Sequence, residues 1–322
     1  MRVALSTSPE TVVIEERPDP IAGPGEVVCR VLACGVCGSD VSSSWVARKV
    51  PAVLGHEVTG VVEQIGAGVD HVRVGDQVVI HHHAPCGECR RCRRGHETLC
   101  ESFRSTALDP GGFADRVRIP SDLVGELLPL DGLDAERGTF VEPLACVLRA
   151  FGRAGLAAGD SLLVVGAGTS GLLAIAAAHA HAVDVVWVRE PRPDRLQRAL
   201  DLGAARHATE LVDVALVCTP AASAIADAAS ALAPGGSLCL YAPPSPTERL
   251  DLDAFGLYTG EIEVHHSYSA GPGDMRAAFD ALRAGTIDPL PLVTHRVGLE
   301  ETAHALDLQR RGEAIKVLVL PT

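Results

Sequence analysis

The sequence predicts an α/β protein of two domains, a β-rich domain followed by a doubly wound parallel sheet. Short apolar segments separated by turns fill the first part of the chain, whereas from about residue 160 onward apolar strands alternate with alanine-rich amphipathic helices. The chain has 322 residues, of which 47% are hydrophobic, so it is long enough to bury two cores of ordinary size.

The first part of the chain has the pattern of a barrel-like β domain. Proline and glycine clusters at 18–20 and 22–25 mark loops. The apolar and β-branched segments around such turns predict strands at 11–15, 26–33, 57–65 and 77–81. We expect this domain to span residues 1–148.

Strands and helices alternate in the second part of the chain, which we expect to form a domain over 149–286. Alternation of this kind is typical of a parallel sheet with helices on both faces. Strands are predicted at 162–165, 183–188, 212–218, 237–241 and 262–266, and helices up to residue 180, at 193–202 and at 222–232.

One connection in this second domain is too short for the usual topology. Gly203 ends a predicted helix, and only eight residues, 204–211, precede the strand that begins at Val212. Neighbouring parallel strands need a crossover of about a dozen residues. We therefore expect a shortened sheet of order 2-1-4-5-6, in which the outer strand of the common 3-2-1-4-5-6 order is missing or vestigial and 204–211 crosses as a loop.

A glycine-rich turn follows the first strand of this sheet. Gly166, Gly168 and Gly171 form a G-x-G-x-x-G motif directly after the strand 162–165, and Ser170 lies in the same turn. The glycines allow a tight turn, a close approach of the backbone to a pyrophosphate, and close helix packing. The motif predicts a Rossmann domain that binds a dinucleotide at the N-terminus of the following helix.

An acidic residue in the expected place favours NAD over NADP. Glu190 lies 19 residues after Gly171, at the end of the second strand, where a carboxylate binds the ribose 2′-hydroxyl. Arg189 and Arg192 flank it and leave NADP open, because either could meet a 2′-phosphate. We expect both arginines to lie on solvent.

Four cysteines predict a structural zinc site. Cys86, Cys89, Cys92 and Cys100 form a C-x2-C-x2-C-x7-C run in a polar segment too short to bury itself. Such thiolate spacing is typical of a closed tetrahedral site in which the metal supplies folding energy. The alternative is a pair of disulfides, which the absence of a secretory leader disfavours.

A second group of possible metal ligands precedes this run. Cys37 supplies a thiolate, His56 an imidazole, and Glu57 or Glu142 a carboxylate. Three protein ligands with one open position are typical of a catalytic zinc site. The sequence leaves open which carboxylate binds the metal directly, and it places Asp40 as the partner that orients His56. Two zinc ions per chain are therefore expected.

Composition excludes several other classes of protein. The net charge of −13 disfavours nucleic acid as a partner. The uncharged stretch 162–178 has three glycines and a strand-turn-helix pattern, so it predicts a buried βα unit and no membrane span. Ten cysteines without a leader indicate a reducing cytoplasm.

Together, the Cys37-Gly-Ser-Asp and Gly55-His-Glu segments, the four-cysteine run and the glycine loop, in this order, resemble the zinc-containing medium-chain alcohol and polyol dehydrogenases. The resemblance covers essentially the whole chain. It implies a GroES-like catalytic domain completed by 287–322, and a homodimer or homotetramer. It also implies hydride transfer between a secondary alcohol, such as a polyol, sugar or cyclitol, and NAD.

The resemblance also assigns roles to individual residues. Glu142 takes the place of a second cysteine ligand, as in polyol dehydrogenases; Ser39 matches the hydroxyl of the proton relay; and Arg195 matches an arginine that helps to hold the adenosine ribose. Many members carry a relay histidine where this chain has Ser42, so the second relay step falls to Ser42 or to water.

Two alternative functions remain, a reductase of an activated carbonyl that uses NADPH and a non-catalytic, zinc-stabilised dinucleotide sensor. The set Cys37, Ser39, His56 and Glu142 favours chemistry over sensing, because a sensor needs no open metal position. Cys34 and Cys37 have the spacing of a redox pair but lack a thioredoxin-like surrounding. The remaining candidates are expected to be structural: Cys29, Cys146, Cys218, Cys239, His81, His82 and His83.

Overall fold

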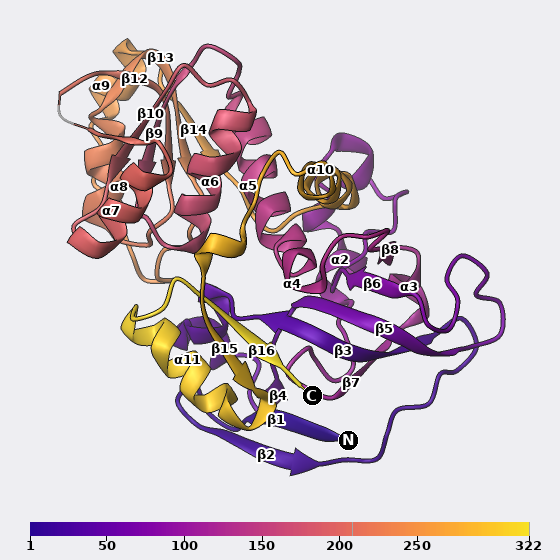
Figure 1. Ribbon diagram of the computed structural model, residues 1–322. Coiled ribbons are helices and arrows are strands. Elements are labelled where there is room, and N and C mark those ends of the chain that lie inside the picture. Colours follow the sequence, from indigo (N-terminus) through magenta and orange to yellow (C-terminus); the bar gives the residue numbers. More distant parts are fainter. Residues whose placement is uncertain (208, 322) are drawn as a thin grey trace. The chain divides into compact units, whose positions relative to one another are not determined.

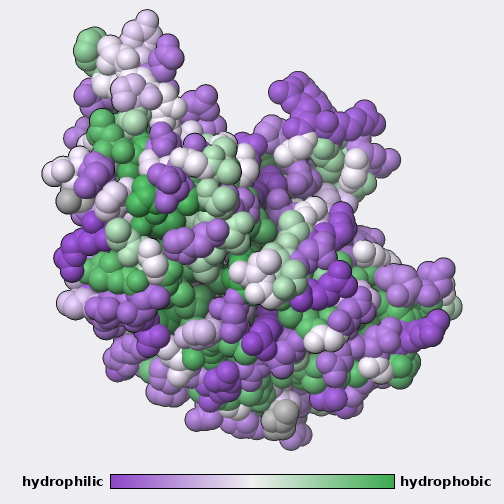
Figure 2. All heavy atoms as spheres, turned by 45° about the horizontal axis from the view of Figure 1, so that its top comes forward, coloured by the Kyte–Doolittle hydropathy of each residue, from purple (hydrophilic) through white to green (hydrophobic). Residues whose placement is uncertain are grey.

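The computed structural model describes residues 1–207 and 209–321. The chain divides into two compact units, Met1–Glu142 together with the chain from Gly271 onward, and Pro143–Ala270. The first is β-rich and the second has a parallel sheet between helices, so the predicted fold class is confirmed (Figure 1). Hydrophilic side chains cover much of the face drawn in Figure 2, with smaller apolar patches between them.

Two sheets form the first unit. A seven-stranded sheet has the order β15-β16-β3-β5-β6-β8 with β7 paired to β3, and a smaller sheet has the order β2-β1-β4. The strands are β1 (Arg2–Ser6), β2 (Val12–Glu16), β3 (Val27–Gly35), β4 (Ala52–Val53), β5 (Glu57–Ile65), β6 (Gln77–Ile80), β7 (Arg116–Ile119), β8 (Leu128–Pro129), β15 (Val293–Gly298) and β16 (Lys316–Leu320).

The helices of the first unit are short apart from two near the end of the chain. Helix α11 (Thr302–Arg311) packs on β15 and β16 and reaches the 3-10 turn η1 (Gly38–Val41) (Figure 1). Helix α10 (Pro272–Arg283) packs against α4 of the same unit. The others are α1 (Ser43–Val46), α2 (Glu101–Ser105), α3 (Ser121–Val124) and α4 (Ala135–Gly138), with turns η2 (Cys92–Arg94), η3 (Glu97–Leu99), η4 (Leu290–Leu292) and η5 (Leu299–Glu301).

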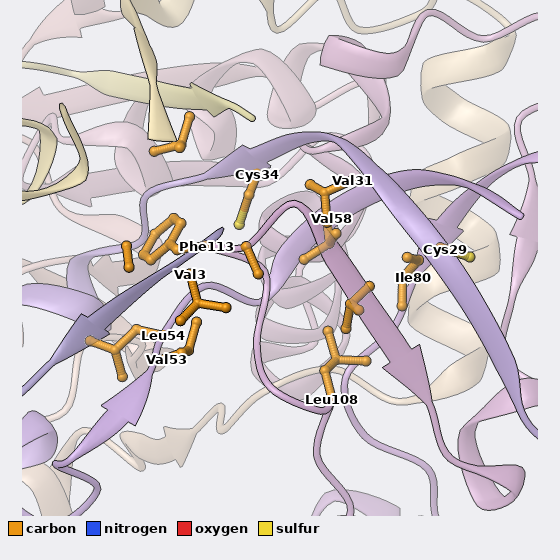
Figure 3. Close-up of a cluster of buried hydrophobic side chains, with 14 of the residues drawn as sticks. Val3, Cys29, Val31, Cys34, Val53, Leu54, Val58, Ile80, Leu108 and Phe113 are labelled. Carbon is orange, nitrogen blue, oxygen red and sulfur yellow. The ribbon is translucent and has the colours of Figure 1, made fainter. Parts of the chain in front are cut away.

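Apolar side chains from distant segments form the core of the first unit. Figure 3 shows Val3, Cys34, Val58 and Phe113 directed toward one another from different segments, and each is at most 1% exposed. Cys29 and Cys34 lie in this core, and burial raises the pKa of the Cys29 thiol to about 12. Both therefore behave as small apolar residues, as expected from the sequence.

The second unit is a six-stranded parallel sheet of order β11-β10-β9-β12-β13-β14. Its central strand β9 is buried at four of its five positions, because helices cover both faces of such a sheet. The strands are β9 (Ser161–Val165), β10 (Val185–Arg189), β11 (Ala205–Arg206), β12 (Val212–Val217), β13 (Leu232–Leu240) and β14 (Glu263–His266). The helices are α5 (Val141–Ala154), α6 (Thr169–Ala180), α7 (Pro193–Asp201), α8 (Ala222–Ala229) and α9 (Ala254–Thr259).

The predicted order 2-1-4-5-6 was wrong, because the outer strand is present, although only as a vestige. A two-residue strand, β11, pairs in parallel with β10 at Trp187 and Val188. No helix lies between β11 and β12 in the part of this connection that the structure describes, which excludes Ala208. Adjacent strands lie about 4.8 Å apart, so β11 and β12, three spacings apart, are separated by about 14 Å. The five residues between them give six steps of about 3.3 Å each, which reach that far.

Helix α8 also differs from the sequence prediction. It was expected to run to residue 232 but ends at Ala229, because Leu232 is the first residue of β13 and pairs with Val212. Strand pairing at this position overrides the helix-forming alanines.

Candidate functional site

The four-cysteine run folds as a compact lobe in which the thiols converge. Cys89 Sγ lies 3.5 Å from Cys92 Sγ, Cys86 Sγ 4.0 Å from Cys92 Sγ, and Cys100 Sγ 3.5 Å from Cys86 Sγ. A tetrahedral ion with metal–sulfur bonds of about 2.3 Å holds its sulfurs about 3.8 Å apart, so the four thiols fit zinc. These separations also exclude disulfides, whose sulfurs lie about 2.05 Å apart.

Backbone turns bring the cysteines of this lobe together. Gly87 and Gly95 adopt φ values of +75° and +72°, a conformation that favours glycine, and Gly95 closes the turn η2 that starts at Cys92. The lobe is largely exposed: only Cys100 of the four ligands is buried.

A second group of possible metal ligands lies within the first unit. Ligand atoms of Cys37, His56 and Glu57 all lie within 4.8 Å of one another. Cys37 caps the turn η1 and accepts a hydrogen bond from Ser39 N, while His56 and Glu57 stand at the start of β5. Gly55 precedes them with φ +89° and packs against Cys34 and Phe113, so only glycine fits this turn.

Asp40 lies beside this group. Its Oδ1 is 3.5 Å from His56 Nδ1, its Oδ2 accepts a hydrogen bond from Cys37 N at 3.0 Å, and its side chain is 5% exposed. Burial opposes charge on His56, but the charges of Asp40 and Cys37 outweigh it and raise the pKa of His56 well above its ordinary value. Asp40 thus fixes the backbone of one candidate ligand and the ring of another.

Glu57 has a partner that sequence reasoning missed. Lys316 Nζ donates to Glu57 Oε2, and to Val36 O at 3.3 Å, and both charged side chains are 1% exposed. The pair fills the space beside Gly35, where a Cβ atom would lie 2.8 Å from Lys316 Nζ and closer still to the carboxylate. The sequence did contain a sign of this buried ion pair: Lys316, one of only two lysines, begins an apolar strand.

The other carboxylate that the sequence proposed as a ligand, Glu142, lies near the start of α5 and is 7% exposed. It is not part of the group formed by Cys37, His56 and Glu57, the only carboxylate-containing ligand group found in the described residues. The structure therefore brings Glu57, and not Glu142, to the other two candidate ligands.

Histidines line the segment that leads from β6 to the cysteine lobe. His81 is 1% exposed and packs against Phe103, and burial lowers its pKa to about 3. His83 Nδ1 bonds Thr106 O at 2.8 Å. The ring of His82 lies 4.9 Å from that of His56, between centroids, and burial lowers its pKa well below its ordinary value.

The glycine loop of the second unit has the geometry that the motif predicts. Gly166 has φ +95°, and a Cβ atom on Gly171 would lie 1.9 Å from Gly166 O. Gly168 caps α6, whose first turn holds Ser170. The Glu190 carboxylate accepts one bond from Ala167 N at 2.7 Å and another from Arg192 N at 2.9 Å. The acidic residue thus stands beside the loop that would hold the phosphates.

Of the two arginines that flank Glu190, Arg189 differs from the expectation that both lie on solvent. Arg189 is 24% exposed; its Nε donates to His207 Nδ1 at 3.0 Å and its guanidinium pairs with Asp227 at 2.6 Å. Arg192 is 41% exposed and pairs with Asp194 at 3.1 Å. Arg195 lies 3.9 Å from the position that a Cβ atom would take on Gly168. Arg189, at the end of β10, thus forms an ion pair with Asp227 of α8.

These features define a class of protein: a GroES-like β domain with two metal-ligand groups, joined to a Rossmann domain with a dinucleotide loop. Residues 23–129 match the alcohol dehydrogenase GroES-like domain family. The sorbitol dehydrogenase of Bacillus subtilis strain 168 is 30% identical over an alignment of 348 positions, gaps included, that covers 100% of this chain and 97% of that protein.

Solved structures agree over the same extent. The alcohol dehydrogenase of Thermus sp. ATN1 is 28% identical with a TM-score of 0.87 and covers 100% of both chains. The 2R,3R-butanediol dehydrogenase of Bacillus subtilis is 25% identical with a TM-score of 0.88 and covers 100% of this chain and 99% of its own. The chain belongs to the zinc-containing medium-chain dehydrogenase/reductase family and is an oxidoreductase.

Among the described residues, no helix combines the length and the apolar character needed to cross a membrane.

Proposed function

We propose that this enzyme is a zinc-dependent dehydrogenase that transfers hydride between a secondary alcohol of the polyol, sugar or cyclitol type and NAD. The observation that carries the proposal is the convergence of Cys37, His56 and Glu57 with Asp40 behind them. This set supplies a thiolate, an imidazole and a carboxylate, the donors that catalytic zinc uses.

Different residues of the chain would bind the metal, orient its ligands and transfer the proton. Cys37 and His56 would hold zinc with Glu57 or Glu142 as the third ligand, and Asp40 orients His56. Bound zinc supplies a Lewis acid for the substrate hydroxyl, and bound NAD supplies the hydride acceptor. Ser39, beside Cys37, would take the hydroxyl proton and pass it toward solvent through Ser42 or water.

The preference for polyols rests on the relatives. Sorbitol and 2R,3R-butanediol dehydrogenases are named for substrates with more than one hydroxyl group. A substrate panel identifies the individual substrate.

The dinucleotide would bind at the glycine loop of the second unit. Gly166, Gly168, Ser170 and Gly171 would hold the pyrophosphate, Glu190 the ribose diol, and Arg195 the adenosine side. The engagement of Arg189 with His207 and Asp227 supports NAD over NADP, because this guanidinium is then not free to meet a 2′-phosphate.

The four-cysteine lobe would hold a second, structural zinc ion. Its sulfur separations fit the ion, and a lobe with one buried ligand has little apolar core of its own.

We place the functional boundaries of the catalytic domain at 1–148 with 287–322, and of the dinucleotide domain at 149–286.

We further propose a cytoplasmic homodimer or homotetramer. Strand β14 is an edge of its sheet, and four apolar side chains near it are exposed: Phe255 (75%), Tyr258 (82%), Val264 (36%) and Tyr268 (40%). An exposed edge beside aromatic residues is suited to pairing with a second copy. Light scattering measures the mass, and Phe255→Ser with Tyr258→Ser should lower it; a monomeric parent protein would contradict this proposal.

One experiment tests the proposed reaction. A panel of polyols, cyclitols and amino alcohols is offered with NAD⁺ and NADP⁺, and metal content is measured by mass spectrometry. We expect reduction of NAD⁺ by at least one polyol and two zinc ions per chain. One zinc ion per chain and no reduction of either cofactor would support the sensor instead, and activity with NADP⁺ alone would reject the role of Glu190.

A further inference from the structure

Two adjacent cations that follow α1 have no acidic partner. Arg48 and Lys49 are both exposed, and neither forms an ion pair with a carboxylate in the part of the chain that the structure describes. The chain has 41 acidic residues against 28 lysines and arginines, so acidic groups are in excess. The other lysine, Lys316, is paired with Glu57. Lys49 is thus the lysine whose counter-charge the described residues do not supply.

The indole ring of Trp45 holds these two side chains near each other. Arg48 Cζ lies 5.8 Å and Lys49 Nζ 5.4 Å from the centroid of the ring. Like charges beside one ring repel each other, and an anion bound between them removes that repulsion. The planar guanidinium can bind two phosphate oxygens at once, and the ammonium group adds a compact charge. The pair therefore has the chemistry of an anion site.

The segment that carries the two cations is fixed beside the Cys37 group. Helix α1 packs against the turn η1, which Cys37 caps. Lys49 N donates to the carbonyl of Val46 at 2.8 Å, and Val46 is 1% exposed in the core of the first unit. Burial raises the pKa of Asp40, but His56 and, to a smaller extent, Lys49 lower it below its ordinary value. Because charges act on one another mainly within about 10 Å, Lys49 lies near the residues that would hold zinc.

We propose that Arg48 and Lys49 bind a phosphate group on the substrate, so that the enzyme acts on a phosphate monoester of a polyol or cyclitol. This inference rests on the proposed dehydrogenase function and narrows its substrate class. The phosphate would lie on a carbon remote from the one that is oxidised, because the two cations follow α1 and are not among the candidate metal ligands.

The charge of the pair favours a phosphate over a carboxylate. A phosphate monoester has a second pKa of about 6 and is mostly a dianion at neutral pH, so it matches two cations, whereas a carboxylate carries one charge. Hydrogen bonds to charged groups contribute about 1.5–3 kcal/mol each, which corresponds to about 10–100-fold in kcat/KM. We therefore expect phosphate esters to be the best substrates, sugar acids intermediate and neutral polyols the poorest.

The parent enzyme provides a test that needs no substitution. Each neutral polyol and cyclitol of the substrate panel is compared with its phosphate monoesters, for example sorbitol with sorbitol 6-phosphate, and with a sugar acid such as gluconate. We expect kcat/KM to be about 10–100-fold higher for the best phosphate ester than for its parent alcohol. The ratio should fall as ionic strength rises, because exposed charges are screened by salt. Equal kcat/KM for the alcohols and their phosphate esters would overturn the inference.

Substitutions locate the preference in the two side chains. Lys49→Gln and Arg48→Gln should each lower the ester-to-alcohol ratio about tenfold, through a higher KM for the ester at nearly constant kcat. Lys49→Arg keeps the charge and should retain most of the ratio. Arg17→Gln is the matched control, because it removes one exposed positive charge from the same unit, where Arg17 is already paired with Glu15 at 3.1 Å. It should leave the ratio unchanged.

The outcomes separate this inference from the function on which it rests. If the parent oxidises neither the alcohols nor their esters with either cofactor, the proposed function fails and the inference falls with it. If it oxidises neutral polyols as well as their phosphates, the function stands and the inference is rejected. Calorimetry with NAD⁺ alone excludes another phosphate source: if Lys49→Gln weakens NAD⁺ binding as much as it raises the KM for the ester, the cations serve the cofactor and the inference is likewise rejected. If a variant does not fold, the substrate ratio of the parent and its salt dependence still decide.

Discussion

The two metal-ligand groups of this enzyme are built in opposite ways. The cysteine lobe takes four identical ligands from 15 consecutive residues, and three of the four are not buried. The group of Cys37, His56 and Glu57 takes different ligands from two elements, and Asp40 and the buried Lys316 support it from behind. We therefore expect the first to depend on the metal for its structure and the second to depend on the protein for its geometry.

This contrast predicts different consequences when each group loses a ligand. In the lobe the metal replaces a hydrophobic core, so its loss should act on folding. In the second group the surrounding core is complete without the metal, because the strands β3 and β5 that carry it are buried among apolar residues. Its loss should act on chemistry.

The largest effect is expected for Cys37→Ala. Loss of the thiolate should lower kcat by at least about a thousandfold, because catalysis depends on the metal. NAD binding measured by calorimetry should stay near that of the parent, since the glycine loop belongs to the other unit. A variant that keeps most of its activity would reject the catalytic assignment.

Cys92→Ser should act on stability first. We expect the free energy of unfolding to fall by several kcal/mol and soluble yield to drop, with activity per folded molecule nearly constant. Thermal unfolding and zinc content measure this, and equal heat stability of variant and parent would show that the lobe needs no structural metal. The control is Arg93→Ser, which changes an exposed residue of the same lobe and leaves its ligands intact.

Lys316→Met should test the support behind Glu57. Removing one partner of a fully buried ion pair costs about 3–5 kcal/mol, because the other charge is left uncompensated. The double variant Lys316→Met with Glu57→Gln should recover most of that loss. Urea unfolding of the two variants gives the comparison, and additive losses would mean that the two side chains do not interact.

Asp40→Asn should weaken zinc binding at the second group and leave the lobe unaffected. Loss of a carboxylate that orients a ligand typically costs about 10–100-fold in metal affinity. Competition with a chelator should release one zinc ion per chain more easily than in the parent. Equal release of both ions, or of neither, would contradict the distinction between the two groups.

The smallest effect is expected at His81, in the segment between the Cys37 group and the cysteine lobe. Both ring nitrogens of His81 are buried without a partner in the described residues. Its pKa of about 3 lies below the ordinary 6.5, so below pH 6.5 the unfolded state binds the extra proton and the folded state loses stability. His81→Leu should remove this loss, about 2 kcal/mol at pH 5. Unfolding curves at pH 5 and 7.5 measure it; an unchanged pH dependence would contradict the burial of an unpaired ring.

Features built from consecutive residues could be predicted from the sequence, whereas contacts between distant residues could not. Cys86 to Cys100 and Gly166 to Gly171 are local patterns whose geometry follows from spacing, and the strand 57–65 was predicted at its observed bounds. The ion pair of Glu57 with Lys316 joins residues 259 positions apart, and no spacing rule connects them. Strand pairing likewise decided the end of α8 and produced β11, because such contacts depend on the finished sheet.

The separation of Glu57 and Lys316 along the chain also sets the delay between their synthesis on the ribosome. Ribosomes add about 5–20 residues per second, so 259 residues separate the synthesis of these partners by roughly 13–50 s. During that interval Glu57 has no lysine, and β3 lacks the neighbour that β16 later provides. The surroundings of Glu57 are therefore complete only after β16 has been made.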